Sequence, residues 1–281
     1  MLTFKSTSYN YKIIKSFAQN EFTPQPLLRD DNGSINIQCV SPIHGRSFIV
    51  NKNSDDKLVI SKGNGLSYST HNSINTESFG KYTWGLLQKD DAIRDFIIGQ
   101  EIQSLGIKTN QMEYVLEIDK EIEINSTGEI IKPHLLQYNV ESPYRISDFG
   151  FISKDTIIQE VKKWETLNEK SFKESYLIAA YVLIKNLRIM HDNNVLHNAI
   201  HVQNYTWALE LLDFESSRSN NFPYSNAEYE KHVPMLVAGE IIQTYEVINY
   251  ISWCLGEVIN YGKIDNLFKQ YGFDLQKFKL F

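Results

Sequence analysis

The pattern of apolar and polar positions changes character near the middle of the chain. The first half contains short runs rich in β-branched and aromatic residues, separated by Gly, Asn and Asp. Runs of this kind predict strands over residues 35–40, 46–50, 57–61, 112–118 and 134–140. Between the third and fourth of these runs, apolar residues recur at helical spacing from residue 91 to 105, which predicts a helix.

From residue 153 onwards, the apolar positions follow a helical period instead. Ser171 and Glu174 match the S-x-x-E pattern, which predicts a capping box before a helix of about five turns. A later apolar run over residues 237–259 predicts one or two buried helices. The order strand, strand, strand, helix, strand, strand is that of a kinase N-lobe, so the chain is predicted to have an α+β, bilobal, protein-kinase-like fold. We expect a β-rich N-lobe over residues 1–145 and a helical C-lobe over residues 146–281.

Composition narrows the class of protein. The chain has 281 residues, 42% of them hydrophobic, and a formal net charge of −6. The negative charge argues against a broad surface for nucleic acid or anionic membrane. The two cysteines, Cys39 and Cys254, lie far apart in sequence and favour a reducing compartment. The N-terminal residues lack a signal-peptide pattern, and the apolar helical stretch 177–184 is too short to cross a bilayer. We therefore predict a cytoplasmic protein without nucleic-acid or membrane partners.

The candidate chemistry centres on Asn204 and Asp213. In kinase-fold enzymes, a loop of the form H-x-D-x-x-x-x-N is followed by an acidic residue after a short strand, and the Asn and the acid hold the metal that bridges the nucleotide phosphates. Here His197 begins such a loop, Asn204 ends it, and Asp213 follows a Leu-Leu pair. Ala199 stands where the loop Asp is expected. The pattern predicts a Mg²⁺ or Mn²⁺ site, with the usual proton acceptor missing.

The two histidines of this segment allow different interpretations. His197 and His201 are four residues apart, a spacing that ligates zinc on a helix, but no third ligand is evident. We instead expect His197 to brace the segment that carries Asp213.

A basic residue completes the candidate site. Lys62 follows the predicted strand 57–61, where kinase-fold proteins place the lysine that contacts the α- and β-phosphates. A carboxylate on the predicted helix 91–105 should hold this lysine, and Asp95 and Glu101 are both candidates. The string Asp148-Phe149-Gly150 precedes the loop, so we assign Asp148 no metal role.

Several segments, in this order, resemble the selenoprotein O family of kinase-fold protein adenylyltransferases. Residues 62–70 resemble its K-G-x-G-x-T-P-Y-S-R stretch, and residues 141–149 resemble A-P-S-x-x-R-F-G-x-F. Residues 197–204 resemble its loop, H-G-V-M-N-T-D-N. Shorter matches at residues 44–46, 84–85, 93–97 and 105–109 extend the resemblance over roughly residues 43–215.

The resemblance implies a role for each matching residue. The residues implied to contact an ATP molecule, bound in a flipped orientation, are Gly45, Arg46, Lys62, Gly85 and Arg145. Asp95 would brace Lys62, while Asn204 and Asp213 would hold the divalent metal; Lys62, Asp95 and Asp213 form the implied catalytic set. The sequence departs from the family at Gln203, because the family places its base there and glutamine does not accept a proton.

Three functions remain open. We favour transfer of AMP from Mg- or Mn-ATP to a hydroxyl group of a protein or small molecule, because Lys62, Asn204 and Asp213 all persist. A catalytically inactive pseudokinase that works as a nucleotide-binding regulatory module is the alternative, and Ala199 and Gln203 are its main support. A phosphotransferase ranks third, because such enzymes rely on the loop Asp that Ala199 replaces.

Overall fold

The computed structural model describes residues 3–17, 22–30, 32–39, 47–52, 57–65, 85–124, 128–224 and 231–275. The chain divides into two compact units: unit 1 comprises residues 1–100 and 110–144, and unit 2 comprises residues 101–109 and 145–281. The predicted mixture of a β-rich sheet and helices is confirmed. The bilobal, kinase-like arrangement stays a prediction.

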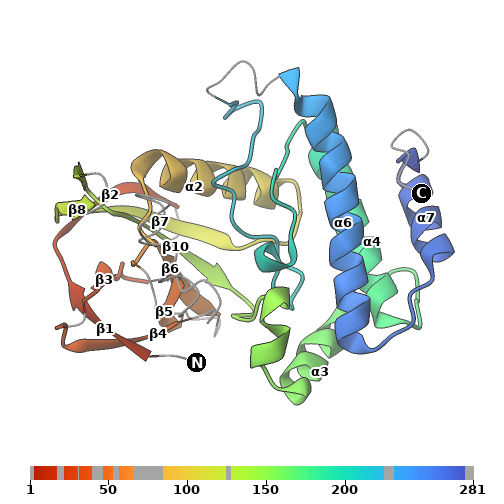
Figure 1. The fold of residues 1–281 in the computed structure, drawn as a ribbon, viewed down its shortest axis with the longest axis horizontal. Helices are drawn as coiled ribbons and strands as arrows, with labels where there is room; N and C mark the ends of the chain where they lie inside the picture. Colours follow the sequence, from red (N-terminus) through yellow and green to blue (C-terminus); the bar gives the residue numbers. More distant parts are fainter. Residues whose placement is uncertain are drawn as a thin grey trace. The chain divides into compact units, whose positions relative to one another are not determined.

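Unit 1 is built on an eight-stranded antiparallel sheet with the order β2-β7-β10-β6-β5-β4-β1-β3 (Figure 1). The strands are β1 (Thr3–Ser8), β2 (Tyr11–Ser16), β3 (Leu27–Arg29), β4 (Ile35–Cys39), β5 (Ser47–Lys52), β6 (Leu58–Lys62), β7 (Gln111–Ile118) and β10 (His134–Val140). A separate hairpin of β8 (Ile122–Ile124) and β9 (Glu129–Ile131) lies between β7 and β10 in sequence. Where the predicted strands fall on described residues, they are confirmed to within two residues at each end. The sequence does not predict β1, β2, β3, β8 or β9.

The central strands of this sheet are buried, although polar residues such as Glu113, Gln137 and Asn139 interrupt their apolar positions. Every residue of β10 is buried, and so is most of β7. Strands covered on both faces lack the alternation of a half-exposed strand. The predicted helix is α2 (Lys89–Ser104), which carries Asp90 and Asp91 in its first turn, where acids favour the helix dipole.

Unit 2 contains the helices α3 (Lys154–Lys162), α4 (Ser175–Asp192), α6 (Val233–Leu255) and α7 (Tyr261–Gln270). Three short 3₁₀ segments accompany them: η2 (Ile146–Phe151), η3 (Lys163–Leu167) and η4 (Val202–Asn204). Figure 1 shows α4 and α6 side by side, and α4 also packs against α7. The predicted apolar run 237–259 is a single helix, α6, which ends at Gly256 in the left-handed conformation. None of the helices in the described ranges combines the length and apolarity needed to cross a membrane.

The predicted capping box at Ser171 and Glu174 is wrong. Helix α4 begins at Ser175, and its N-cap Glu174 makes no side-chain capping bond. The carboxylate of Glu257 accepts the backbone N–H groups of Ser175 and Tyr176 instead, at 2.9 and 2.8 Å. Glu257, which follows α6 in sequence, therefore caps α4 in place of the predicted Ser171.

Candidate functional site

The loop that carries Asn204 and the segment that carries Asp213 are paired by backbone hydrogen bonds in unit 2. Tyr205 and Leu211 form an antiparallel bridge, and the N–H of Leu212 donates to the carbonyl of Asn204 at 2.9 Å. A tight turn closes this pairing, in which the N–H of Thr206 donates to the carbonyl of Glu210. Asp213 follows Leu212 directly. Asn204 and Asp213 are nine residues apart in sequence, but across the two paired segments they are only about one residue apart.

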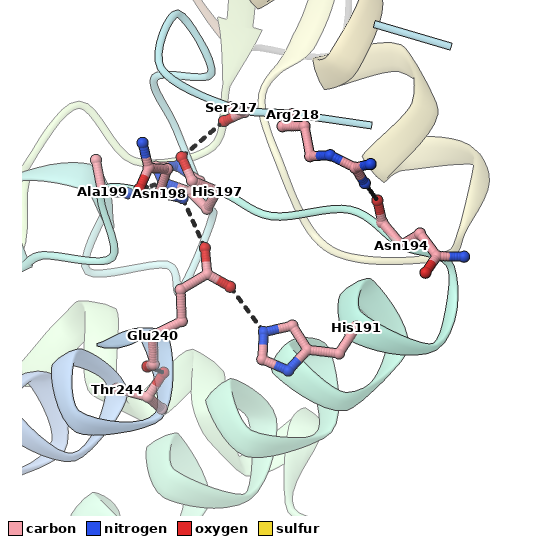
Figure 2. A network of polar contacts seen from close by, with 9 residues as sticks. All are labelled: His191, Asn194, His197, Asn198, Ala199, Ser217, Arg218, Glu240 and Thr244. Atoms are coloured by element: carbon pink, nitrogen blue, oxygen red, sulfur yellow. Dashed lines mark hydrogen bonds and ion pairs between the residues drawn. The ribbon is translucent and has the colours of Figure 1, made fainter. Parts of the chain in front are cut away.

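His197 braces this segment, as predicted. Its Nε2 lies 2.8 Å from the carbonyl oxygen of Leu212, and its Nδ1 accepts the N–H of Ala199 at 3.2 Å. Since Nδ1 accepts, Nε2 must carry the proton and donate, a tautomer assigned from the hydrogen-bond network. The imidazole also packs edge-on against Phe214, with ring centroids 5.3 Å apart. Ser217 adds a hydrogen bond to the His197 carbonyl (Figure 2).

His201 has a local role. Its Nδ1 accepts the N–H of Gln203 at 3.4 Å at the start of η4, and the residue is exposed. Within the described ranges, no cluster of three or more His, Cys, Asp or Glu residues is arranged to hold a metal.

The side chain of Asn204 is held in one orientation. The residue is 9% exposed, and its Nδ2 donates to the carbonyl of Ala199 at 2.9 Å. This bond fixes the nitrogen branch of the amide and leaves Oδ1 as the branch able to ligate a cation. Asp213 is half-buried and has a φ of 72°, in the left-handed region. One amide oxygen and one carboxylate are donors that suit Mg²⁺ or Mn²⁺, which take their remaining ligands from phosphates and water. The donor chemistry therefore fits the predicted metal.

In unit 1, the predicted ion pair between Lys62 and Asp95 is present. The Nζ of Lys62 on β6 lies 2.7 Å from Oδ2 of Asp95 on α2, and the two side chains are 3% and 1% exposed. Desolvating both charges is costly, and a buried pair of this kind is often no more stable than an apolar substitute. Its presence therefore suits a role that needs the ammonium held in place.

The backbone beyond Lys62 requires glycine. Gly63 has a φ of 95°, and a Cβ at this position would lie 2.5 Å from the carbonyl oxygen of His134. Gly65 donates its N–H to the carbonyl of Gly85 at 3.3 Å. Of the implied nucleotide-binding residues, Gly45 and Arg46 lie outside the described residues.

Arg145 makes a structural contact at the loop. Its guanidinium Nη1 donates to the carbonyl of Gln203 at 2.6 Å, and its backbone N–H donates to Oδ2 of Asp148 at 3.0 Å. Asp148 is thus the acid of a capping box at the start of η2. The contact of Arg145 with ATP stays a prediction.

Sequence reasoning overlooked Glu240 on α6. Its carboxylate is 1% exposed and accepts the backbone N–H of Asn198 at 2.6 Å (Figure 2). Burial, and then the charge of Glu240, raise the pKa of the Tyr205 phenol, so this phenol stays neutral. Glu240 is one of three glutamates in the run 237–259, and the sequence gives no signal that it, rather than Glu246 or Glu257, is the one buried against the loop.

Comparisons with known proteins add little to this geometry. No protein-family model and no curated protein matches the sequence. Among solved structures, the chain is similar to "ROP18 kinase domain in complex with AMP-PNP and sucrose", with 13% sequence identity and a TM-score of 0.37. The match covers 77% of this chain and 56% of that chain, so this chain spans little more than half of its length. A match with this identity and TM-score indicates neither a ligand nor a reaction for this chain. The resemblance to the selenoprotein O family rests on the sequence motifs alone.

Proposed function

We propose that the chain is a kinase-like protein that binds ATP with Mg²⁺ or Mn²⁺ and transfers AMP to a hydroxyl group. The observation that carries the proposal is the pairing of residue 204 with residue 212, which brings the Asn204 and Asp213 positions together on a braced loop. The buried Lys62–Asp95 pair supports it independently, because a fixed ammonium suits a phosphate group.

The roles follow from the chemistry of the side chains. Lys62 would neutralise phosphate charge and Asp95 would hold it in place, while Asn204 and Asp213 would ligate the metal. A bound metal neutralises the phosphates and fixes their orientation. Nucleotide contacts by Gly45, Arg46, Gly85 and Arg145 complete the proposal.

The transfer step needs no residue acting as a strong base. The acceptor oxygen attacks the α-phosphorus, the bond to the bridging oxygen breaks, pyrophosphate leaves, and the acceptor proton passes to water. No residue from 197 to 204 carries a carboxylate. The absence of a general base lowers the rate by about 10²–10⁴-fold, whereas positioning and charge neutralisation remain.

The same absence favours the alternative, a pseudokinase that binds the nucleotide as a regulatory module. A phosphotransferase, in which the attack falls on the γ-phosphorus, is the remaining candidate. In each case the acceptor or partner would be a protein or a small molecule.

One experiment distinguishes these functions. The full chain is incubated with Mg²⁺ or Mn²⁺ and ATP labelled on the α- or the γ-phosphate. Label transferred from the α-position alone supports adenylyl transfer, and label from the γ-position alone supports phosphoryl transfer. Thermal stabilisation by metal-ATP without any transfer supports the pseudokinase.

The metal site has its own test. We expect Asp213→Ala to reduce metal-dependent ATP affinity at least about tenfold, because a direct ligand is lost. Asp155→Ala is the matched control, since Asp155 is an exposed acid on α3 of the same unit. Unchanged metal-dependent affinity in Asp213→Ala would overturn the proposed site.

A further inference from the structure

Residues 22–29, here called the N-terminal strap, are bound to the sheet of unit 1 through their backbone. The side-chain amide of Gln137 on β10 accepts the N–H of Gln25 at 3.1 Å and donates to the carbonyl of Gln25 at 2.6 Å. The hydroxyl of Tyr114 on β7 donates to the carbonyl of Phe22 at 2.9 Å. Gln137 is fully buried, and a buried amide is costly unless it is hydrogen-bonded. The strap and Gln137 therefore depend on each other.

The strap is bound a second time just beyond the end of β6. The side chain of Asn64 is fully buried, and its Nδ2 donates to the carbonyl of Leu27 at 2.5 Å. The backbone carbonyl of Asn64 accepts the N–H of Arg29 at 2.8 Å. Asn64 follows Lys62 by two residues, with Gly63 at its positive φ between them. The path of the backbone after Lys62 is therefore fixed against the strap.

The end of β6 is held on both faces of the sheet. Successive side chains of a strand point to opposite faces. Lys62 forms its ion pair with Asp95 of α2 on one face. On the other face, the hydroxyl of Ser61 accepts a hydrogen bond from Nε2 of Gln137 at 3.2 Å. The chain is thus tied to the strap one residue before Lys62, through Gln137, and two residues after it.

We propose that Gln137 and Asn64 are positioning residues that use the N-terminal strap to fix the backbone around Lys62, so that its ammonium meets a phosphate group. This inference rests on the proposed function for the phosphate, whereas the geometry of the strap is independent of it. Neither residue is expected to touch the nucleotide. A hydrogen bond to a charged group commonly changes affinity by about tenfold or more, and it depends on direction and distance. Release of the strap should therefore weaken ATP binding through Lys62.

The test is a double-mutant cycle on ATP affinity, measured with Mg²⁺ on the full chain. We expect Gln137→Leu to lower the affinity about tenfold. In the background of Lys62→Met with Asp95→Leu, the same substitution should lower the affinity less than about twofold, because the group that Gln137 positions is already absent. Unchanged affinity in Gln137→Leu, or an equal loss in both backgrounds, would overturn the proposal.

Hydrogen exchange without nucleotide is the second readout. In Gln137→Leu, exchange should become faster at Gln25, whose N–H loses its acceptor. It should also become faster at Gly65, whose N–H donates to the carbonyl of Gly85 beyond the end of β6. Faster exchange at Gln25 alone would show that the strap does not hold the end of β6, and this result would also overturn the proposal.

Controls separate positioning from general stability. Gln38→Ala removes an exposed amide from β4 of the same sheet and should change neither readout. If Gln137→Leu does not fold, Asn64→Ala carries the test, with the same directions expected. That substitution removes the bond to the Leu27 carbonyl and leaves the backbone bond to Arg29 in place.

The two proposals fail in different ways. If the unmodified chain does not bind ATP, the proposed function is overturned, and exchange alone judges the strap. Faster exchange at Gly65 in Gln137→Leu then supports the role of the strap in holding the end of β6, and unchanged exchange there overturns it.

Discussion

Replacing Asp95 with Leu should destabilise unit 1 strongly, because the ammonium of Lys62 would lose its carboxylate partner in a buried place. The two atoms lie 2.7 Å apart, and the side chains are 3% and 1% exposed. Removing one member of a buried ion pair costs about 3–5 kcal/mol. Domains are usually stable by about 5–15 kcal/mol, so this loss is a large share of the total.

The double variant Lys62→Met with Asp95→Leu should behave differently. Both charges are gone, their desolvation cost disappears, and apolar side chains fill similar volume. Replacing a whole buried pair in this way is often neutral or stabilising by about 1–4 kcal/mol. We therefore expect the double variant to be at least as stable as the unmodified chain, while ATP affinity falls because the ammonium is absent.

The assay is urea-dependent hydrogen exchange of amides in β6 and β10, which reports on unit 1 by itself. ATP affinity is measured on the same samples. If Asp95→Leu lowers the unfolding free energy of unit 1 by less than about 1 kcal/mol, the argument that the buried ion pair matters is refuted. It is also refuted if the double variant loses as much unfolding free energy as the two single variants added together. Normal ATP affinity in the folded double variant would show that Lys62 does not contribute to ATP binding.

Three further substitutions test unit 1. Gly63→Ala should cost more than about 2 kcal/mol, because it adds strain at positive φ and a contact 2.5 Å from the His134 carbonyl. Gly128→Ala has similar strain but open space and should cost about 1 kcal/mol; equal losses would contradict the steric argument. Burial lowers the pKa of His134, so the unfolded chain binds a proton more readily and stability falls as the pH drops below about 6.5. In His134→Gln, the slope of the unfolding free energy against pH between pH 7 and 5 should be smaller by at most about 1.4 kcal/mol per pH unit. An unchanged slope would contradict this.

Burial alone does not decide which strands the sequence predicts. Strand β4 is predicted although three of its five side chains are exposed, whereas β3, with two buried leucines, is missed. Strands β7 and β10 contain enough β-branched, aromatic and leucine residues between their polar ones for the local pattern to find them. The missed strand β2 is an edge strand whose side chains are largely exposed, and its sequence, Y-K-I-I-K-S, lacks a regular alternation of apolar and polar residues. The pairing of β2 with β7 creates this strand, and such long-range pairing leaves little trace in a local window.

The failure at the start of α4 has the same origin. Ser171 and Glu174 satisfy a four-residue rule, but Ser171 takes a φ of 54° and the helix starts later. Glu257 reaches the first amides from a position 81 and 82 residues away. A capping rule weighs only local partners, and here a tertiary partner of higher charge prevails.

The loop shows which part of a site can be predicted by spacing. The distance in sequence from Asn204 to Asp213 follows from one tight turn, so a motif can encode it. The hydrogen bond from the Asn198 N–H to Glu240 joins residues 42 positions apart and depends on how α6 packs, so no local motif predicts it.

Backbone strain provides an argument for this segment that does not depend on any resemblance. Among the described residues, five non-glycine residues have positive φ, and four of them are Asn194, Asn198, Leu209 and Asp213. Each such conformation costs roughly 1–2 kcal/mol and persists only where surrounding contacts enforce it. Glycine would relieve the strain at residue 213, but it has no carboxylate. An acid kept at this strained position, beside an Asn204 amide whose nitrogen is bonded to the Ala199 carbonyl, motivates the proposed cation site. The metal-dependent affinity of Asp213→Ala is the measurement that decides whether the strain serves that purpose.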